Sequence, residues 1–172
     1  MEKTTDIFAP PSISPVRILF IGQAPSRDTD GKPPFTGRCG AFLAEKLLNM
    51  SQGEMLKCHD FKNVLSRWPG KGAGGDKFPM AEARIAAEAL IPLMKDRTVV
   101  LLGYNVARAF NIQAFTYLQC YVFRHRGVEV TQDMYVIPHP SGINRHWNDR
   151  TNIDEARKLL RFISFKVSRE QR

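Results

Sequence analysis

The chain has few cysteines and no long hydrophobic run. Its apolar stretches, such as Val99–Leu102, are far shorter than the ~20 residues that a membrane-spanning helix needs. Met1–Pro15 lacks the basic start and long apolar core of a signal peptide. The cysteines Cys39, Cys58 and Cys120 form an odd, scattered set, which favours reduced thiols over a disulfide framework. We therefore expect a cytoplasmic protein with no membrane contact.

The composition fits one folded domain. The chain has 172 residues, of which 43% are hydrophobic, enough to bury a single core. Lysine and arginine exceed aspartate and glutamate by 25 − 17 = +8, which favours a polyanionic partner. We predict a flexible lead over 1–15, one domain over 16–167 and a tail over 168–172, and we expect a monomer.

Hydrophobic patterning predicts strands that alternate with helices. Short apolar runs indicate strands at Val16–Ile21, Phe61–Leu65, Thr98–Leu102, Val128–Val130 and Met134–Ile137. Helical spacing indicates helices at Gly40–Met50, Met80–Lys95, after a cap at Asn105, and at Asn152–Val167. This alternation predicts a three-layer α/β/α fold around a central four-stranded, mostly parallel sheet.

Ligands of such sheets bind outside the carboxyl ends of the strands. Four segments lie at these ends, namely Gly22–Ser26 after the first strand, Asn63 near the end of the second, Gly103–Asn105 after the third and His139–Arg145 after the last. A histidine there can hydrogen-bond an oxygen on which negative charge develops. The amide of Asn63 can read the edge of a pyrimidine. The alternatives are a histidine that only caps the sheet edge and an asparagine that only forms a turn.

Two loop residues suit nucleic acid. Phe35, between two prolines and a glycine, can stack on a base, or else anchor its loop to the domain. Ile143 is apolar in a polar loop and can wedge into a base stack, or else tuck under the loop. Each residue alone leaves both interpretations open.

Taken together, these segments resemble the uracil-DNA glycosylase superfamily, most closely its family-4 and family-5 branches. Five short motifs stand in the superfamily's order over roughly Arg17 to Asn148. They are Gly22-Gln23-Ala24-Pro25, Pro34-Phe35-Thr36-Gly37-Arg38-Cys39-Gly40, Phe61-Lys62-Asn63-Val64, Val99–Gly103 with Ala107, and His139-Pro140-Ser141. The resemblance implies a parallel sheet between helical layers and a base flipped to the strand ends.

The resemblance also implies roles for single residues. His139 would stabilise charge on O2 of the leaving pyrimidine, and Gln23 would contact the base or a water. Stacking and edge contacts to the base would come from Phe35, Asn63, Gly22 and Ala24. Contacts to DNA would come from Ser141, Ile143, Arg145, Ser26, Arg38, Arg67 and Lys71. The expected activity is monofunctional excision of uracil or a related deaminated or modified pyrimidine from DNA, leaving an abasic site.

The sequence departs from the superfamily pattern at the first motif and at the cysteines. Its strongest members carry a carboxylate where Gln23 and Ala24 stand, and Asp28 or Asp30 could substitute for it. Family 4 binds an iron–sulfur cluster through four cysteines, whereas this chain has three, none at a matching position. We therefore expect no cofactor and no metal. Two alternatives stay open, a module that binds modified bases without cleavage and an enzyme acting on free nucleosides or nucleotides.

Overall fold

The computed structural model describes residues 17–169, apart from the side chains at 131 and 132. The predicted lead over 1–15 and the last three residues of the predicted tail lie outside this range. Among the described residues, no helix is long and apolar enough to cross a membrane.

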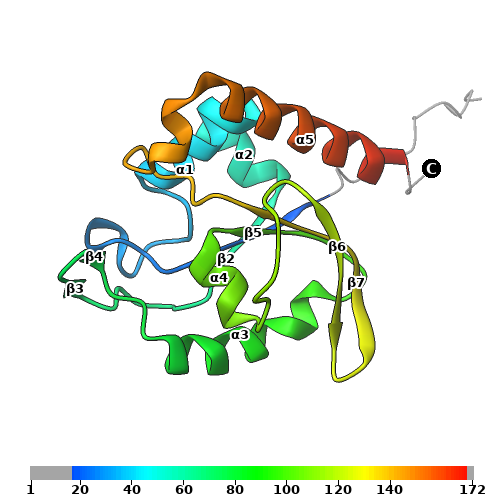
Figure 1. The fold of residues 1–172 in the computed structure, drawn as a ribbon. Coiled ribbons are helices and arrows are strands. Elements are labelled where there is room, and N and C mark those ends of the chain that lie inside the picture. The colour runs from blue at the N-terminus through cyan, green and yellow to red at the C-terminus, as the bar shows by residue number, and fades with distance from the viewer. Residues whose placement is uncertain (1–16, 170–172) are drawn as a thin grey trace, which may run out of the picture.

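A five-stranded sheet forms the centre of the molecule (Figure 1). Its strands, in spatial order, are β2 (Asp60–Asn63), β1 (Leu19–Gly22), β5 (Thr98–Leu102), β7 (Val128–Ile137) and β6 (Cys120–His125). The first four run parallel, and β6 pairs antiparallel with β7. Strands β1 and β5 are buried along their whole length, as expected for parallel strands covered on both faces.

Helices cover both faces of this sheet. One face carries α3 (Met80–Met94) and α4 (Tyr104–Ala109), as Figure 1 shows. The other face carries α1 (Arg38–Phe42), the π-helical turn Leu43–Leu48, α2 (Gln52–Cys58) and α5 (Arg150–Arg169). The predicted α/β/α class is confirmed.

Strand side chains alternate between two apolar cores, one on each side of the sheet. Leu19 and Ile21 pack with α3 and α4, while Phe20 packs toward α5. The core on the α5 side extends to the last residues of β5 and β7, Leu102 and Ile137, so polar side chains at the ends of these two strands come from the segments that follow them.

The sequence prediction missed part of the sheet. The expected strands Val128–Val130 and Met134–Ile137 are one continuous strand, β7, and the turn lies before it, at Arg126 and Gly127 with φ of 50° and 80°. Positive φ at both positions is what a tight hairpin turn requires. The preceding strand, β6, was not predicted. It is the edge strand of the sheet, and Phe123 is the one buried residue among its six.

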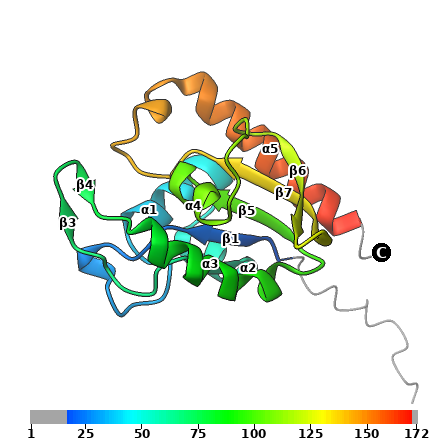
Figure 2. The same cartoon turned by 60° about the horizontal axis from the view of Figure 1, so that its bottom comes forward.

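Two helices and one loop segment differ from the sequence prediction or were missed by it. Helix α2 was not predicted, although Ser51 and Glu54 form a capping box at its start. The helix after β5 begins beyond Gly103, so Asn105 lies inside α4 and is not its cap. The glycine-rich segment Arg67–Lys77, which has no apolar run and so predicts a loop, contains a two-stranded hairpin, β3 (Lys71–Gly72) and β4 (Gly75–Asp76), which projects from the body (Figure 2).

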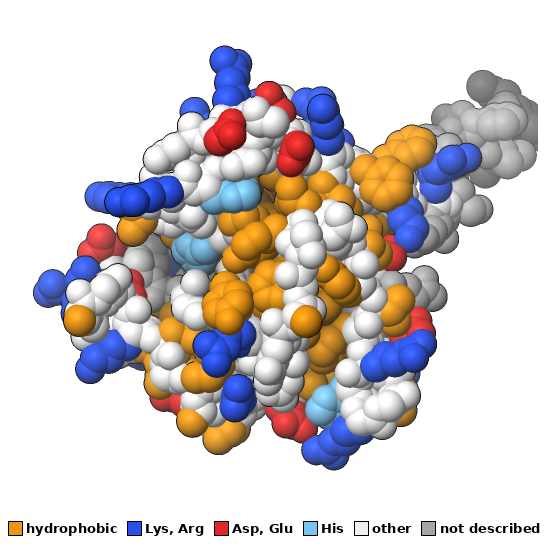
Figure 3. Space-filling model, viewed as in Figure 1, with side chains coloured by type: hydrophobic (Ala, Val, Ile, Leu, Met, Phe, Trp, Pro, Cys, Tyr) orange, Lys and Arg blue, Asp and Glu red, His pale blue; other side chains and the backbone are white. Residues whose placement is uncertain are grey.

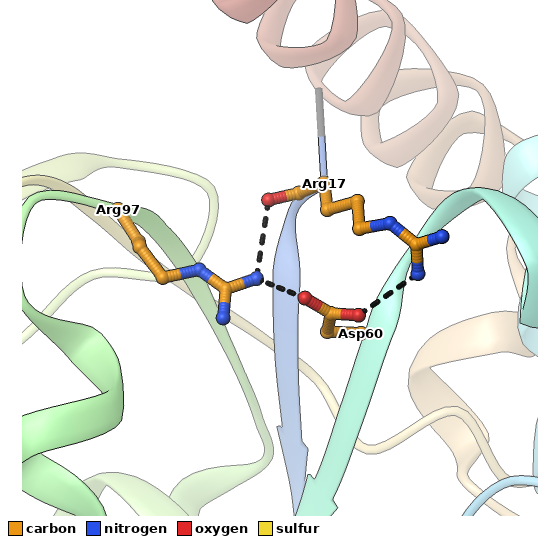
Figure 4. A network of polar contacts seen from close by, with 3 residues as sticks. All are labelled: Arg17, Asp60 and Arg97. Carbon is orange, nitrogen blue, oxygen red and sulfur yellow. Dashed lines mark hydrogen bonds and ion pairs between the residues drawn. The ribbon is translucent and has the colours of Figure 1, made fainter. Parts of the chain in front are cut away.

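The amino ends of three strands are tied together by one carboxylate. Asp60 accepts hydrogen bonds from Arg17 at 3.1 Å and from Arg97 at 2.5 Å, and Arg97 also donates to the carbonyl of Arg17 (Figure 4). Burial by itself would raise the pKa of Asp60, but the bonds and charges of Arg97 and Arg17 outweigh it and lower that pKa. The cluster lies at the opposite end of the strands from the candidate site.

Candidate active site

The four parallel strands end side by side at one edge of the sheet. Gly22 at the end of β1 stands level with Asn63 on β2, and Leu102 on β5 stands level with Ile137 on β7. Beyond the paired ends, the backbone N–H of Val64 still donates to the carbonyl of Gly22, at 2.9 Å. The segments that follow these strands therefore meet, as the sequence predicted.

Gly103 brings Gln23 and His139 together. Its φ is +107°, and a Cβ added to it would lie 3.1 Å from Cβ of His139 and 3.5 Å from Nε2 of Gln23. The backbone after β5 can pass so close only because this residue has no side chain. The two residues predicted to act in catalysis therefore lie against one backbone position.

Gly22 brings together Phe35 and Asn63, the two residues predicted to stack on the base and to bind its edge. A Cβ there would lie 2.6 Å from the Phe35 ring and 2.7 Å from Oδ1 of Asn63. The ring and the amide thus both reach the end of β1. Ala24 lies near them in the chain, half-buried, but its side chain packs against the core under α3.

Phe35 is held in an unusual backbone conformation. Its φ is +62°, which costs roughly 1–3 kcal/mol for a residue with a side chain. Nε2 of Gln52 donates to the carbonyl of Phe35 at 2.6 Å and to that of Gly37 at 3.1 Å. The Phe35 ring lies 5.3 Å from the ring of Phe61 on β2. The ring therefore anchors its loop and also borders the strand end, so both sequence interpretations of Phe35 fit.

His139 is positioned through its backbone carbonyl. This oxygen accepts hydrogen bonds from Nε1 of Trp147 at 2.8 Å, from Nδ2 of Asn144 at 3.1 Å and from the N–H of Ser141 at 2.8 Å. Burial lowers the pKa of the imidazole below its ordinary value of 6.5. The ring is therefore neutral at pH 7, so one nitrogen donates a hydrogen bond and the other accepts one.

The loop after β7 presents an apolar tip. Ile143 is 93% exposed, so the alternative that it tucks under the loop is wrong. Its N–H donates to the Ser141 hydroxyl, at 3.4 Å. Arg145, just beyond the tip, is exposed as well.

Several residues predicted to contact DNA already have partners. Arg67 pairs with Asp30 at 3.1 Å, and Asp30 also accepts a hydrogen bond from the Trp68 N–H. Lys71 lies 4.0 Å from Asp76 within the hairpin. Asp30 therefore braces the loop that leads to the hairpin, and no contact places it beside His139.

The other members of that set lie on exposed turns. Ser26 shares a hydrogen bond of 2.9 Å with Thr29, and Arg38 is the exposed first residue of α1. The exposed Asp28 lies in the 3₁₀ turn between them.

Metal-binding groups are scattered. The three cysteines are free and lie on α1, α2 and β6. Within 17–169, no three histidine, cysteine or acidic side chains cluster as metal ligands would. Three cysteines do not fit a four-cysteine iron–sulfur cluster.

Sequence reasoning missed Gln52, Asn144 and Trp147. None touches a strand end itself, and each acts on a residue that does. Asn144 belongs to the predicted segment His139–Arg145 and Trp147 lies two residues beyond it, but which backbone oxygen they bind is set only by the folded loop. Gln52 lies 17 residues beyond Phe35, outside every motif.

The fold and the site define an α/β protein with an aromatic ring, two amides and a histidine gathered at the carboxyl edge of a parallel sheet. The model of the Uracil DNA glycosylase superfamily matches residues 11–161. The chain belongs to this superfamily, and the resemblance inferred from the five motifs is confirmed at that level. A search among curated proteins finds no match.

Proposed function

We propose that this chain is a monofunctional DNA glycosylase that flips out and excises uracil or a related deaminated or modified pyrimidine. The observation that carries the proposal is the meeting of Gln23 and His139 against Gly103, with Phe35 and Asn63 at the next strand end. Membership of a superfamily of DNA glycosylases supports it. The closest branch, by its motifs, is family 4 or family 5.

The base would lie between these two strand ends. Its face would stack on Phe35, and the Asn63 amide would bind its Watson–Crick edge. This orientation directs O2 of the pyrimidine toward His139. The backbone near Gly22 would approach the base because no side chain intervenes.

In the reaction, the bond between N1 of the pyrimidine and C1′ of the sugar breaks, and its electron pair leaves with the base. A neutral His139 would donate a hydrogen bond to O2, where the charge gathers. Water adds to C1′ and loses a proton to solvent, while the released base takes up a proton. Gln23 would orient that water but cannot take its proton.

This mechanism favours bases that leave as stable anions. Removal of one hydrogen-bond donor at such a site costs about 2.7–4 kcal/mol, so His139 would carry much of the rate. Uracil and 5-substituted uracils are better leaving groups than adenine derivatives. None of the residues proposed to contact the base or the water (Gln23, Phe35, Asn63 and His139) is a lysine, so no Schiff base and no strand cleavage by the protein are expected.

A second candidate is a module that binds modified bases without cutting. The observation that favours it is the first motif, where Gln23-Ala24 replaces the carboxylate. Asp30, which could substitute for it, is engaged with Arg67 instead.

One experiment separates the candidates. Single- and double-stranded oligonucleotides with one uracil, hydroxymethyluracil, hypoxanthine or xanthine are incubated with the protein and then treated with alkali. Strand breaks at the pyrimidine that fall about a hundredfold or more in His139→Ala support the glycosylase. Tight lesion binding without breaks supports the binding module, and activity on free nucleosides alone refutes both.

A further inference from the structure

A row of aromatic rings lies beside the candidate site. Tyr104, Phe115, Tyr117, His146 and Trp147 follow one another with ring centroids 5.8, 5.3, 6.2 and 4.8 Å apart. We call these five residues the aromatic row. They come from the start of α4, the segment before β6 and the loop after β7. The first three have no role in the mechanism proposed above.

Both ends of the aromatic row adjoin His139. Trp147 donates its indole hydrogen bond to the His139 carbonyl. Tyr104 directly follows Gly103, whose backbone lies against His139 and Gln23. Consecutive Cα atoms are ~3.8 Å apart, so the backbone of Tyr104 lies one residue from the position that contacts His139 and Gln23.

The aromatic row changes from buried to exposed along its length. Trp147 is 6% exposed, whereas Tyr104 is 50% exposed. Tyr104 and Tyr117 both lie against the Phe115 ring. Burial first, and Tyr104 second, raise the pKa of Tyr117. Figure 3 shows apolar side chains gathered on the face that Figure 1 also presents, with histidine side chains beside them. An aromatic surface next to the site is therefore open to solvent.

A positive charge accompanies the exposed end. The guanidinium of Arg108 lies over the Tyr104 ring, 5.6 Å from its centroid. An exposed ring with a neighbouring cation suits a ligand that has both flat aromatic faces and phosphates, as nucleic acid does. The net charge of +8 favours the same polyanion.

We propose that the aromatic row, entered at Tyr104, stacks an unpaired base next to the target nucleotide, so that the protein favours single-stranded over double-stranded DNA. Every base of a single strand can offer a face to an aromatic ring, whereas in a duplex both faces are already stacked. This inference rests on the proposed function for the position of the target nucleotide. It adds the form of DNA that the site prefers.

The test compares two substitutions at one position. Tyr104→Leu removes the aromatic face, and Tyr104→Phe keeps it. The matched control is Phe165→Leu. Phe165 is 62% exposed, and the guanidinium of Arg169 lies over its ring, 5.5 Å from the centroid, as that of Arg108 does at Tyr104. Phe165 lies near the other end of the strands, next to Lys166, which pairs with Asp133 on β7.

Fluorescence anisotropy measures the affinity of each variant for a uracil-free oligonucleotide, single-stranded or as a duplex. We expect Tyr104→Leu to weaken single-strand binding about fivefold or more, with duplex binding changed less than about twofold. Tyr104→Phe and Phe165→Leu should bind as the unmodified protein does. Equal losses on both forms of DNA, or no loss, would overturn the proposal.

Uracil-free DNA needs no cleavage, so this result stands apart from the glycosylase assay. If no strand breaks occur but Tyr104→Leu still loses single-strand affinity, only the proposed function fails. If cleavage occurs and the affinities do not change, only the aromatic row proposal fails.

A second measurement uses the unmodified protein and does not depend on how Tyr104→Leu folds. A single-stranded oligonucleotide carries uracil and, one nucleotide away, 5-iodocytosine as a photo-crosslinker. A crosslink to the peptide that contains Tyr104 supports the proposal. Crosslinks confined to other peptides overturn it.

Discussion

The backbone carbonyl of His139 accepts hydrogen bonds from two side chains of its own loop. Trp147 and Asn144 donate to that oxygen at 2.8 and 3.1 Å. A shift of about 1 Å in a catalytic group can cost a hundredfold in rate, so in the proposed mechanism these bonds would position the imidazole for the reaction. At the scale of single residues, the role proposed for His139 would thus depend on partners that touch no substrate.

Trp147→Phe tests this dependence. The change removes the indole donor and keeps an aromatic ring against Phe42 and His146. Loss of one hydrogen bond of about 1 kcal/mol predicts a fall in kcat of roughly fivefold with KM little changed. Steady-state kinetics on a uracil-containing oligonucleotide measures both constants.

The matched control is Trp68→Phe. The indole nitrogen of Trp68 is buried and has no hydrogen-bond partner among the described residues. Its removal should leave kcat unchanged. Equal losses in the two variants, or a rise in KM without a fall in kcat for Trp147→Phe, would argue against positioning of His139.

At the scale of elements, the segment from Phe35 to α2 behaves as one clamp. Gln52, the first residue of α2, bridges the carbonyls of Phe35 and Gly37. A Cβ at Gly40 would lie 1.7 Å from the Phe35 carbonyl oxygen, so α1 also presses on the same peptide. Two short helices therefore hold the left-handed conformation of Phe35.

Gln52→Glu tests the clamp with almost no change of shape. A carboxylate cannot donate, and its charge would face two carbonyl oxygens. Unsatisfied buried acceptors cost about 1–3 kcal/mol each, so kcat/KM on uracil-containing DNA should fall about tenfold as Phe35 loses its position.

The exposed Gln119→Glu adds the same charge away from the clamp. We expect its kcat/KM to remain within about twofold of the unmodified value, since isolated surface substitutions have small effects. If the two variants lose kcat/KM equally, the effect of the added negative charge on DNA binding explains the loss, and the clamp does not.

At the scale of the whole molecule, the two ends of the sheet have different tasks. The carboxyl ends gather the candidate site, whereas the amino ends are joined through Asp60, Arg17 and Arg97. The pKa of Asp60 is lower in the folded chain than its ordinary value near 3.9. The charge of Asp60 therefore stabilises the fold at pH values above its ordinary pKa. This stabilisation is lost as the pH falls toward the lowered pKa.

Asp60→Asn should accordingly destabilise the protein at pH 7 by about 1 kcal/mol, a modest amount because the pair is partly exposed. The difference from the unmodified protein should shrink as the pH falls below about 4. Urea unfolding across this range measures it. Asp154→Asn, which removes an exposed pair with Arg157 on α5, should change stability less, and a difference independent of pH would contradict the role of Asp60.

The charge of the whole chain makes a separate prediction. If exposed cations near the strand ends bind phosphates, DNA affinity falls with the logarithm of salt concentration. Arg38→Gln and Arg145→Gln should each reduce the slope of log affinity against log salt concentration by about 1. Lys95→Gln, at the amino end of β5, should leave it unchanged, and equal slopes in all variants would mean that the charges act only as a solvated surface.

Much of the site could be predicted from the sequence, because strand ends are marked locally. Apolar runs that stop at Gly22 and Gly103 indicate where two parallel strands end, and parallel strands end at a common edge. The end of β2 at Asn63 is not marked in this way, because Val64 and Leu65 continue the apolar pattern. The contributions of Gln52 and Trp147 could not be predicted in this way. Their partners are single backbone oxygens, and every residue offers one.

The sequence by itself determined the α/β class, the order of the motifs and the identity of the groups at the strand ends, because these depend on local patterning. Only the tertiary structure decided how they are held. It paired Asp30 with Arg67, exposed Ile143 and placed Tyr104 at one end of an aromatic row that closes at Trp147. Such contacts join residues far apart in the chain, and their geometry exists only once the sheet and its two helical layers have packed.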